Sequence, residues 1–430
     1  MHRIPRLRSG RALAAAATAL VTVGVFAAPA AGAASGRATA TEKVLYSFAG
    51  ANGAGPLNGV IHGPDGKLYG TTVFGGRHGL GCVYSLTPSG SGYTEKVLFS
   101  FDNADGSKPG GNVAVGAHGD LFGETVIGGA DQNGVAFELV PAGPGSYSEK
   151  VLYTFTGGAD GGQPIGAPVL DTRGDMFGVT QFGGTGGQGV IYELTRSASG
   201  YTEHVLHSFA SQAGQPQAGL TMTGTGTLFG TLYGASAVNT NGTVFRLRLT
   251  KTGPVYTDIY NFKGGTDGSN PFAVLTVDGR TGVIYGTTEY GGGSGSLGTV
   301  FSLTPAGPGY TERVLHSFTM HRGGFLPQAP LLREPDGDLF GVTDIGGVKC
   351  AGTGCSTVFE LAPAGTGYTF QVLYRFTGPP DGAEAEWAGL IPGPAGTMIG
   401  ATRSGGTARN CADGGPGGVL GCGTIYQITP

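Results

Sequence analysis

The chain has 430 residues, of which 86 are glycine, 25 are proline and only 13% are charged. This composition excludes a helical bundle and a charged disordered chain, because the apolar residues come in strand-length bursts between turn residues. Without residues 1–33 the chain keeps 21 basic and 29 acidic residues, a net charge of about −8. We therefore expect no nucleic-acid partner and no binding to an anionic membrane surface.

Residues 1–33 have the pattern of a secretory signal peptide. Four arginines in residues 3–11 precede an apolar run at 12–28, and Ala-Gly-Ala at 31–33 provides a small-residue cleavage site. An uncleaved membrane anchor is the alternative, although the run is short and only moderately apolar. We expect a signal peptide at 1–33, a short linker at 34–40, and a secreted protein without a later transmembrane segment.

One short phrase of the type Val-Leu-Tyr-Ser-Phe recurs seven times after this segment. Its closing phenylalanines are 53, 54, 54, 53, 56 and 58 residues apart: Phe48, Phe101, Phe155, Phe209, Phe262, Phe318 and Phe376. A period of this length is typical of an array of supersecondary units.

Each unit contains four strand-like bursts. In the first unit these are residues 57–61, 67–72, 83–88 and 93–101, and Pro-Asp-Gly or Gly-Gly turns separate the first three. Four antiparallel strands repeated seven times predict an all-β fold, a seven-bladed β-propeller. The predicted blades are 57–101, 110–155, 164–209, 217–262, 271–318, 329–376 and 387–430 plus 41–48.

The ends of the repeat array predict how the ring closes. The array begins with an unpaired strand at 41–48 and ends on a third strand at 425–428. We expect the N-terminal strand to complete the last blade, which also hides strand edges that would otherwise pair with other chains. An open β-solenoid or two sandwiches are the alternatives. The first burst of each unit then lines the axis, where the residues are small: Gly59, Gly111, Ala167, Gly219, Ala273, Ala329, Pro330 and Gly389.

The five cysteines predict two local disulfides and one free thiol. Cys350 and Cys355 bracket one loop, and Cys411 and Cys422 bracket another, which in an exported protein favours the pairs Cys350–Cys355 and Cys411–Cys422. A four-cysteine zinc site is the alternative, although the spacing is not that of a zinc knuckle. Cys82, beside a strand start, is left over as a buried free thiol.

The loops between the second and third strands share one face with the connections between blades. Functional groups usually sit on loops held by a rigid scaffold, so this face is the predicted ligand-binding face. Its connections carry four Asp-Gly pairs, at Asp105, Asp160, Asp267 and Asp381. Asp before Gly is also ordinary turn chemistry. Calcium needs more carboxylates per loop than are present, so we expect no cofactor or metal, with calcium as the alternative.

A second candidate set follows the second strand in different blades. Gln181, Glu289, Asp344 and Arg403 stand where the first two blades have Val73 and Val126. At the top of the channel they would form a polar ligand site with paired carboxylates, which suits acid–base chemistry. The alternative is a set of solvated loop residues. Because no nucleophile elbow, HExxH helix or phosphate loop is present, we assign no catalytic residue and favour a protein that is not an enzyme.

The repeat resembles the GloVer (Gloeo/Verruco) tandem repeats of bacteria. The resemblance covers nearly all of residues 41–430 and depends on Glu-Lys-Val-Leu-Phe-Ser-Phe at 95–101, Asp-Gly-Lys-Leu-Tyr-Gly-Thr-Thr at 65–72 and Gly-Thr-Val-Phe-Ser-Leu-Thr-Pro at 298–305. It implies an exported, often surface-attached repeat protein. Members often carry a C-terminal anchor, whereas this chain stops at Pro430, so free secretion is the expectation.

These observations predict a secreted, monomeric scaffold for binding or display, with an unknown glycan or surface protein as the partner. One alternative is an extracellular polysaccharide lyase or hydrolase with its site at the channel mouth, and another is a purely structural envelope protein. A cluster of His, Tyr, Asp or Glu around the axis would favour the enzyme. A mouth lined by Gly, Ala and Val would favour binding or structure.

Overall fold

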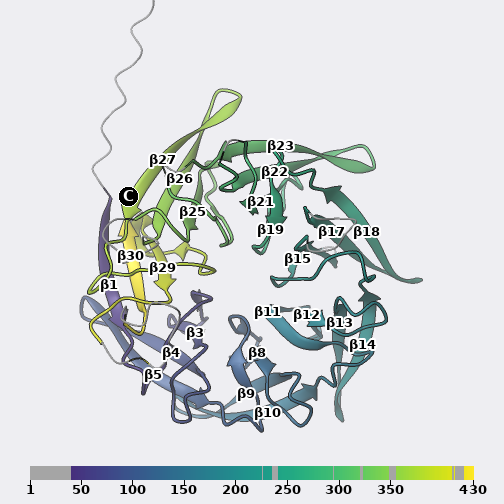
Figure 1. The fold of residues 1–430 in the computed structure, drawn as a ribbon. Helices are drawn as coiled ribbons and strands as arrows, with labels where there is room; N and C mark the ends of the chain where they lie inside the picture. Colours follow the sequence, from purple (N-terminus) through teal and green to yellow (C-terminus); the bar gives the residue numbers. More distant parts are fainter. Residues whose placement is uncertain are drawn as a thin grey trace, which may run out of the picture. The chain divides into compact units, whose positions relative to one another are not determined.

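The computed structural model describes residues 40–224, 226–234, 241–293, 295–319, 323–347, 355–408, 411 and 421–430. The predicted signal peptide at 1–33 and the predicted linker up to residue 39 lie outside the described residues. The described chain forms seven antiparallel sheets that stand as blades around a central axis (Figure 1). The predicted all-β, seven-bladed propeller is therefore confirmed.

Two strand positions lie closest to the axis in every blade. The inner strands are β2 (Val60–His62), β6 (Ser107–Pro109), β7 (Ala114–Val115), β11 (Gly162–Leu170), β15 (Thr221–Thr223), β19 (Ser269–Pro271), β20 (Thr276–Val277), β24 (Leu332–Arg333) and β28 (Ile391–Pro392). The second strands are β3 (Leu68–Thr72), β8 (Leu121–Ile127), β12 (Met176–Phe182), β16 (Thr227–Leu232), β21 (Ile284–Tyr290), β25 (Leu339–Thr343) and β29 (Met398–Thr402).

The other two positions form the body and the rim of each blade. The third strands are β4 (Cys82–Ser89), β9 (Val135–Gly143), β13 (Val190–Ser197), β17 (Thr243–Thr250), β22 (Thr299–Ala306), β26 (Thr357–Ala364) and β30 (Thr424–Thr429). The outer strands are β5 (Gly92–Ser100), β10 (Ser146–Thr154), β14 (Gly200–Ser208), β18 (Gly253–Asn261), β23 (Gly309–Ser317), β27 (Gly367–Arg375) and β1 (Thr41–Ser47). A single 3-10 turn, η1 (Pro394–Gly396), joins β28 to β29 among the described residues.

Except for β11, the inner strands are short or divided. The first burst was expected at 57–61, whereas β2 begins at Val60, and in two blades the inner strand is split into β6 and β7 or β19 and β20. The cause is crowding at the axis. A Cβ added to Gly111 would lie 1.9 Å from the carbonyl carbon of Gly166 in the next blade, so backbone packs directly on backbone there.

The two ends of the array meet in one sheet, as predicted. β1 pairs antiparallel with β30 from Thr41 opposite Thr429 to Ser47 opposite Thr424, and the order of this sheet is β1-β30-β29-β28. The N-terminal strand thus becomes the outer strand of the last blade. The ring is closed by the same kind of strand pairing that builds every other blade.

The repeated phenylalanine explains why neighbouring blades adhere. At each interface its buried ring contacts an aromatic ring of the third strand in the next blade. Ring centroids are 4.9–5.5 Å apart in the pairs Phe48–Tyr84, Phe101–Phe137, Phe155–Tyr192, Phe209–Phe245, Phe262–Phe301, Phe318–Phe359 and Phe376–Tyr426. Such edge-to-face and tilted pairs stabilise beyond the area they bury. The equivalence of all seven interfaces is what a closed ring requires.

The glycine of the second-strand phrase makes room for these rings. A Cβ on Gly70 would lie 2.4 Å from the hydroxyl of Tyr84, and one on Gly230 would lie 2.4 Å from Cζ of Phe245. Both distances are far below ordinary contact. The Leu-x-Gly phrase is therefore a packing feature, because only glycine leaves space for the aromatic ring.

The cysteines agree with the prediction where they are described. Cys411 and Cys422 form a disulfide, with Cα atoms 5.4 Å apart. Cys82 is a buried free thiol and the first residue of β4. Cys350 lies outside the described residues, and with it the predicted Cys350–Cys355 bond.

Candidate functional site

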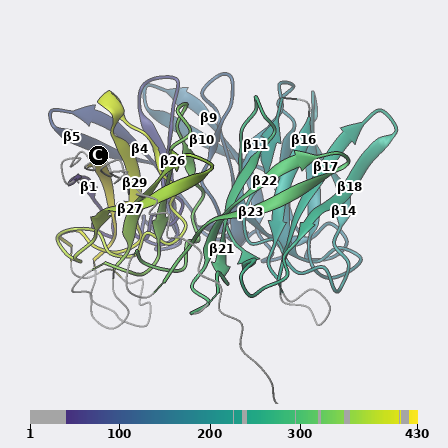
Figure 2. The ribbon, with the colours of Figure 1, turned by 90° about the horizontal axis from the view of Figure 1, so that it is seen from above.

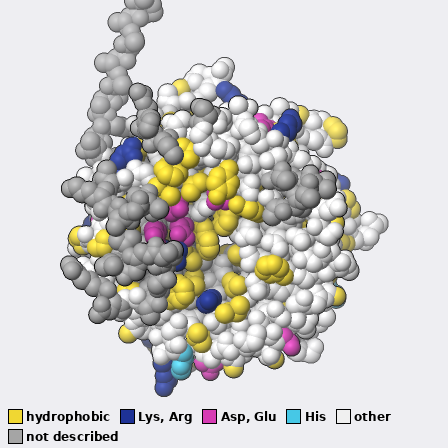
Figure 3. Space-filling view, viewed as in Figure 1, with side chains coloured by type: hydrophobic (Ala, Val, Ile, Leu, Met, Phe, Trp, Pro, Cys, Tyr) yellow, Lys and Arg dark blue, Asp and Glu magenta, His cyan; other side chains and the backbone are white. Residues whose placement is uncertain are grey.

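The loops between second and third strands and the connections between blades form one face of the ring. They are tied by repeated backbone hydrogen bonds, such as Gly129 N to Asn103 O at 2.8 Å and Gly184 N to Gly158 O at 2.8 Å. Seen from the side, these loops run along the lower edge of Figure 2, and short hairpins extend from the opposite edge. We call this the loop-rich face. It is the one that Figure 3 views.

The four aspartates of the Asp-Gly pairs do not point toward a common site. Asp160 accepts hydrogen bonds from Thr156 N at 2.8 Å and from the Tyr153 hydroxyl at 3.1 Å. Asp267 accepts from Lys263 N and from the Tyr260 hydroxyl. Asp381 accepts in the same way from Thr377 N and from the Tyr374 hydroxyl. Asp105 accepts from Asp102 N. Each carboxylate is engaged within its own connection, as the turn interpretation expected.

The second candidate set is brought together in part. Asp344 and Arg403 follow β25 and β29, the second strands of neighbouring blades, and Glu289 lies near the end of β21. The charges of Arg403 and Glu289 both act on Asp344. Gln181 lies elsewhere on the ring, where its Nε2 donates to Gln217 Oε1 at 2.7 Å. Tyr233 occupies the equivalent position after β16, and the sequence analysis missed it.

Two further carboxylates, from the connection before the last blade, complete this group. Arg403 Nη1 lies 3.0 Å from Glu386 Oε1, and Ser404 Oγ donates to Glu384 Oε2 at 3.0 Å. We call Glu289, Asp344, Glu384, Glu386 and Arg403 the acidic rim. Acidic and hydrophobic side chains gather side by side near the middle of the face in Figure 3.

Asp344 and Glu386 of the acidic rim are partly buried, and this burial affects their protonation. Burial, followed by the charges of Glu386 and Glu384, raises the pKa of Asp344 to about 7, although Arg403 opposes the rise. Burial also raises the pKa of Glu386, and the nearby Arg403 again acts in the opposite direction. Asp344 therefore holds a proton in part of the molecules at neutral pH, while Glu386 has a guanidinium partner.

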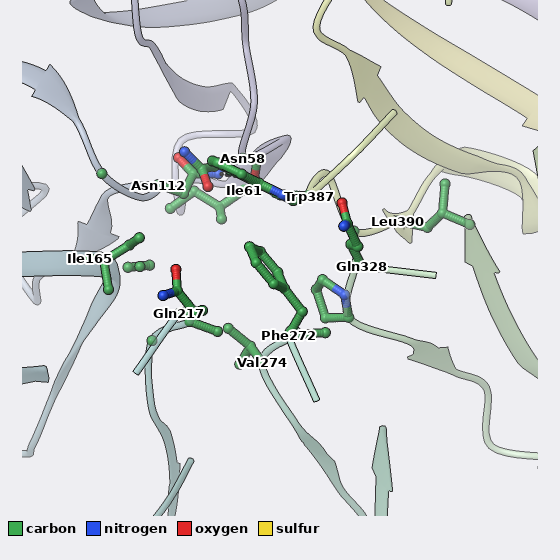
Figure 4. A pocket seen from close by; sticks show the side chains of 18 of the residues that line it. Asn58, Ile61, Asn112, Ile165, Gln217, Phe272, Val274, Gln328, Trp387 and Leu390 are labelled. Atoms are coloured by element: carbon green, nitrogen blue, oxygen red, sulfur yellow. Dashed lines mark hydrogen bonds between the residues drawn. The ribbon is translucent and has the colours of Figure 1, made fainter. Parts of the chain in front are cut away.

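Next to the acidic rim, the axis contains a cavity of about 230 Å³. Phe272 and Trp387 stack there, with ring centroids 5.5 Å apart and planes inclined by 29°. Figure 4 shows their side chains and four amides around the axis; the amides belong to Asn58, Asn112, Gln217 and Gln328. Among the described residues, no charged side chain lines this cavity.

The chain places these groups by a shared local pattern. Gln217 and Gln328 directly follow a proline in the connection that leads to an inner strand, and Phe272 follows Pro271, the last residue of β19. Proline fixes its own backbone angle and donates no hydrogen bond, so it suits a connection that ends at the axis. Only small residues were predicted at the axis, so these large side chains depart from the prediction. The residue that follows the proline differs in type from blade to blade, and this variation is the sequence signal that could have revealed the large side chains.

Metal-binding clusters and membrane-spanning helices are both absent from the described part of the chain. It contains no group of three or more His, Cys, Asp or Glu side chains that could hold a metal ion. It also contains no helix long and apolar enough to cross a membrane.

Comparisons with known proteins agree with the repeat and with the fold. A family model described as the Gloeobacter/Verrucomicrobia repeat matches residues 34–238 and 203–414. No curated protein matches the chain.

Two solved structures similar to this chain show its fold alone. A putative 6-phosphogluconolactonase from Bacteroides uniformis is 12% identical with a TM-score of 0.51, over 86% of this chain and 100% of that one. PorZ of Porphyromonas gingivalis, a bacterial surface component of the type-IX secretion system, is 14% identical with a TM-score of 0.51, over 90% of this chain and 48% of that one.

Proposed function

The chain belongs to the Gloeobacter/Verrucomicrobia repeat family, and we propose that this member is an exported propeller that binds saccharide in its central cavity. The stacked pair Phe272–Trp387 within a ring of four amides carries the proposal. Aromatic rings offer flat apolar surface to the C–H face of a sugar ring. Asn and Gln amides both donate and accept hydrogen bonds, as sugar hydroxyls do.

The size and charge of the cavity limit the classes of ligand that it can bind. At about 230 Å³ it lies below the ~300–1,000 Å³ typical of sites that enclose a drug-sized molecule. It suits one sugar ring, with the rest of an oligosaccharide lying over the loop-rich face. The described lining contains no cation to pair with a phosphate or sulfate group, and the neighbouring acidic rim would repel one.

Export is supported by two separate features. The Cys411–Cys422 disulfide is of a kind that persists in oxidising compartments outside the cytosol. The N-terminal 33 residues have the charge and hydropathy pattern of a signal peptide. Recovery of the protein from the culture medium or the envelope, with a new N-terminus near residue 34, would be the expected result, whereas an intact Met1 in the cytosol would contradict it.

Trp387 is the chain's only tryptophan, so its fluorescence reports directly on the cavity. A glycan array should identify a saccharide that then shifts this fluorescence in a saturable titration. Phe272→Ala, which keeps the reporter, should weaken binding at least about tenfold, as truncation of a central aromatic anchor does. Phe182→Ala is the matched control, because Phe182 is 42% exposed and does not line the cavity. Binding that is unchanged in Phe272→Ala would refute the proposed site.

One observation favours a second candidate function, hydrolysis of the bound saccharide. A carboxyl with a pKa of about 7 beside a carboxylate held by arginine has the acid and base of a general acid–base pair, here Asp344 and Glu386. A turnover assay on the bound saccharide tests it. Asp344→Asn should abolish product formation while Trp387 still reports binding. Absence of product from the unaltered protein would leave a binding protein.

A further inference from the structure

We propose that the saccharide bound in the cavity carries positively charged amino groups, and that the acidic rim selects it over neutral and anionic sugars. This rests on the proposed function, because the cavity is the site and the rim only determines its specificity. The chemical class is an amino-sugar oligomer with free amines.

The cavity and the acidic rim lie next to each other. Glu386 directly precedes Trp387, so a carboxylate and a stacking ring come from consecutive residues. The Tyr233 ring lies 6.0 Å from the Phe272 ring, and its hydroxyl is within hydrogen-bonding reach of Glu289. A sugar ring stacked in the cavity therefore has its substituents beside the carboxylates.

The rim has more negative charge than its own cation can balance. Arg403 is the basic side chain that acts on Asp344, and it already pairs with Glu386 at 3.0 Å. Glu384 accepts a hydrogen bond from the neutral Ser404 hydroxyl. Like charges held close together in a partly buried place are unfavourable, and an incoming ammonium relieves this, whereas a uronic acid or sulfate adds to it.

The aromatic side of the site favours the same ligand. A cation near the face of Trp or Phe is attracted by the ring quadrupole. The half-buried rings of Phe272 and Trp387 would thus contact the sugar ring and its ammonium together. The neutral amides that line the cavity then form hydrogen bonds with the hydroxyl groups.

The test compares the glucosamine tetramer with the N-acetylglucosamine tetramer, two ligands of equal length that differ in charge. In neutral, low-salt buffer the Trp387 signal should show the glucosamine tetramer binding at least about tenfold more tightly, and added salt should reduce this preference. Asp344→Asn and Glu384→Gln should each lower this preference several-fold, because they weaken binding of the glucosamine tetramer more than binding of the N-acetylglucosamine tetramer. Asp336→Asn, the same charge change in a turn on the opposite face, is the control.

The outcomes separate this inference from the proposed function. If both tetramers bind equally in a Phe272-dependent manner, saccharide binding stands and charge selection is wrong. If glucosamine binding survives Phe272→Ala, the amine attaches to the acidic surface without the cavity, and the inference fails. If spermidine binds as tightly as the glucosamine tetramer, the protein recognises an ammonium group alone and the amino-sugar class is wrong. If no saccharide changes the signal, both proposals fall.

Discussion

Replacing Phe48 with alanine tests whether the N-terminal strand closes the ring energetically. Phe48 is fully buried, and its ring lies 5.0 Å from the Tyr84 ring of the first blade, among Ala54, Val60 and Ile425. Removing a buried phenylalanine from a packed core costs about 3–5 kcal/mol. Because the seven interfaces are equivalent, we expect Phe48→Ala to fall in this range although it lies at the edge of the array.

The measurement is urea unfolding of the chain from residue 34 onward with its disulfide intact. Phe209→Ala, the same change at an internal interface with ring centroids 5.5 Å apart, supplies the comparison. Phe182→Ala, with a 42% exposed ring, should change stability by less than about 0.5 kcal/mol. A loss below about 1 kcal/mol for Phe48→Ala beside a full loss for Phe209→Ala would refute closure by β1 as a stabilising element.

Three other predictions concern packing, pH and the disulfide. Gly230→Ala should cost about 1–3 kcal/mol, because its Cβ would lie 2.4 Å from Phe245, while Gly279→Ala has nothing within 4 Å; equal urea midpoints would contradict this. Burial, then the charge of Asp160, raises the folded-state pKa of Glu203 from 4.5 to about 7, so its stabilising contribution is complete below pH 4.5 and is lost as the pH rises through 7. Glu203→Gln should reduce that slope in unfolding experiments across this range, and an unchanged slope would show that Glu203 is not responsible. Replacing Cys411 and Cys422 together with serine should lower stability by up to about 3 kcal/mol, and an unchanged midpoint would show that their loop contributes nothing.

The blade architecture was readable from the sequence because each interface repeats the same contact. A buried aromatic pair needs a phenylalanine at one strand end and a glycine opposite its partner ring, so both recur at a fixed spacing. The inner strands were predicted less well. Near the axis the backbones of neighbouring blades touch, as at Gly111 and Gly166, and this contact between blades leaves no periodic hydrophobic pattern.

The site was predicted only in part, for a related reason. Asp344 and Arg403 were found because their charge departs from the valines of the first two blades. Phe272 and Trp387 were missed because they are 115 residues apart, and their contact depends on how two blades face each other across the axis. Tyr233 was missed because an aromatic residue at a strand end suggests packing before it suggests a ligand.

Some residues that depart from the repeat are explained by contacts within the fold, and others are not. Glu124 is a buried acid where other blades have threonine, valine or alanine, but the hydroxyl of Tyr192 in the next blade donates a hydrogen bond to it. That departure therefore has a partner inside the protein for Oε1, while its Oε2 is buried without a hydrogen-bond partner in the described part of the chain. The acidic rim and the Phe272–Trp387 pair have only part of theirs, because one arginine stands among the four carboxylates of the rim and the rings line a cavity. A repeat protein needs no such groups at its axis to fold, and for this reason we assign their complement to the proposed saccharide.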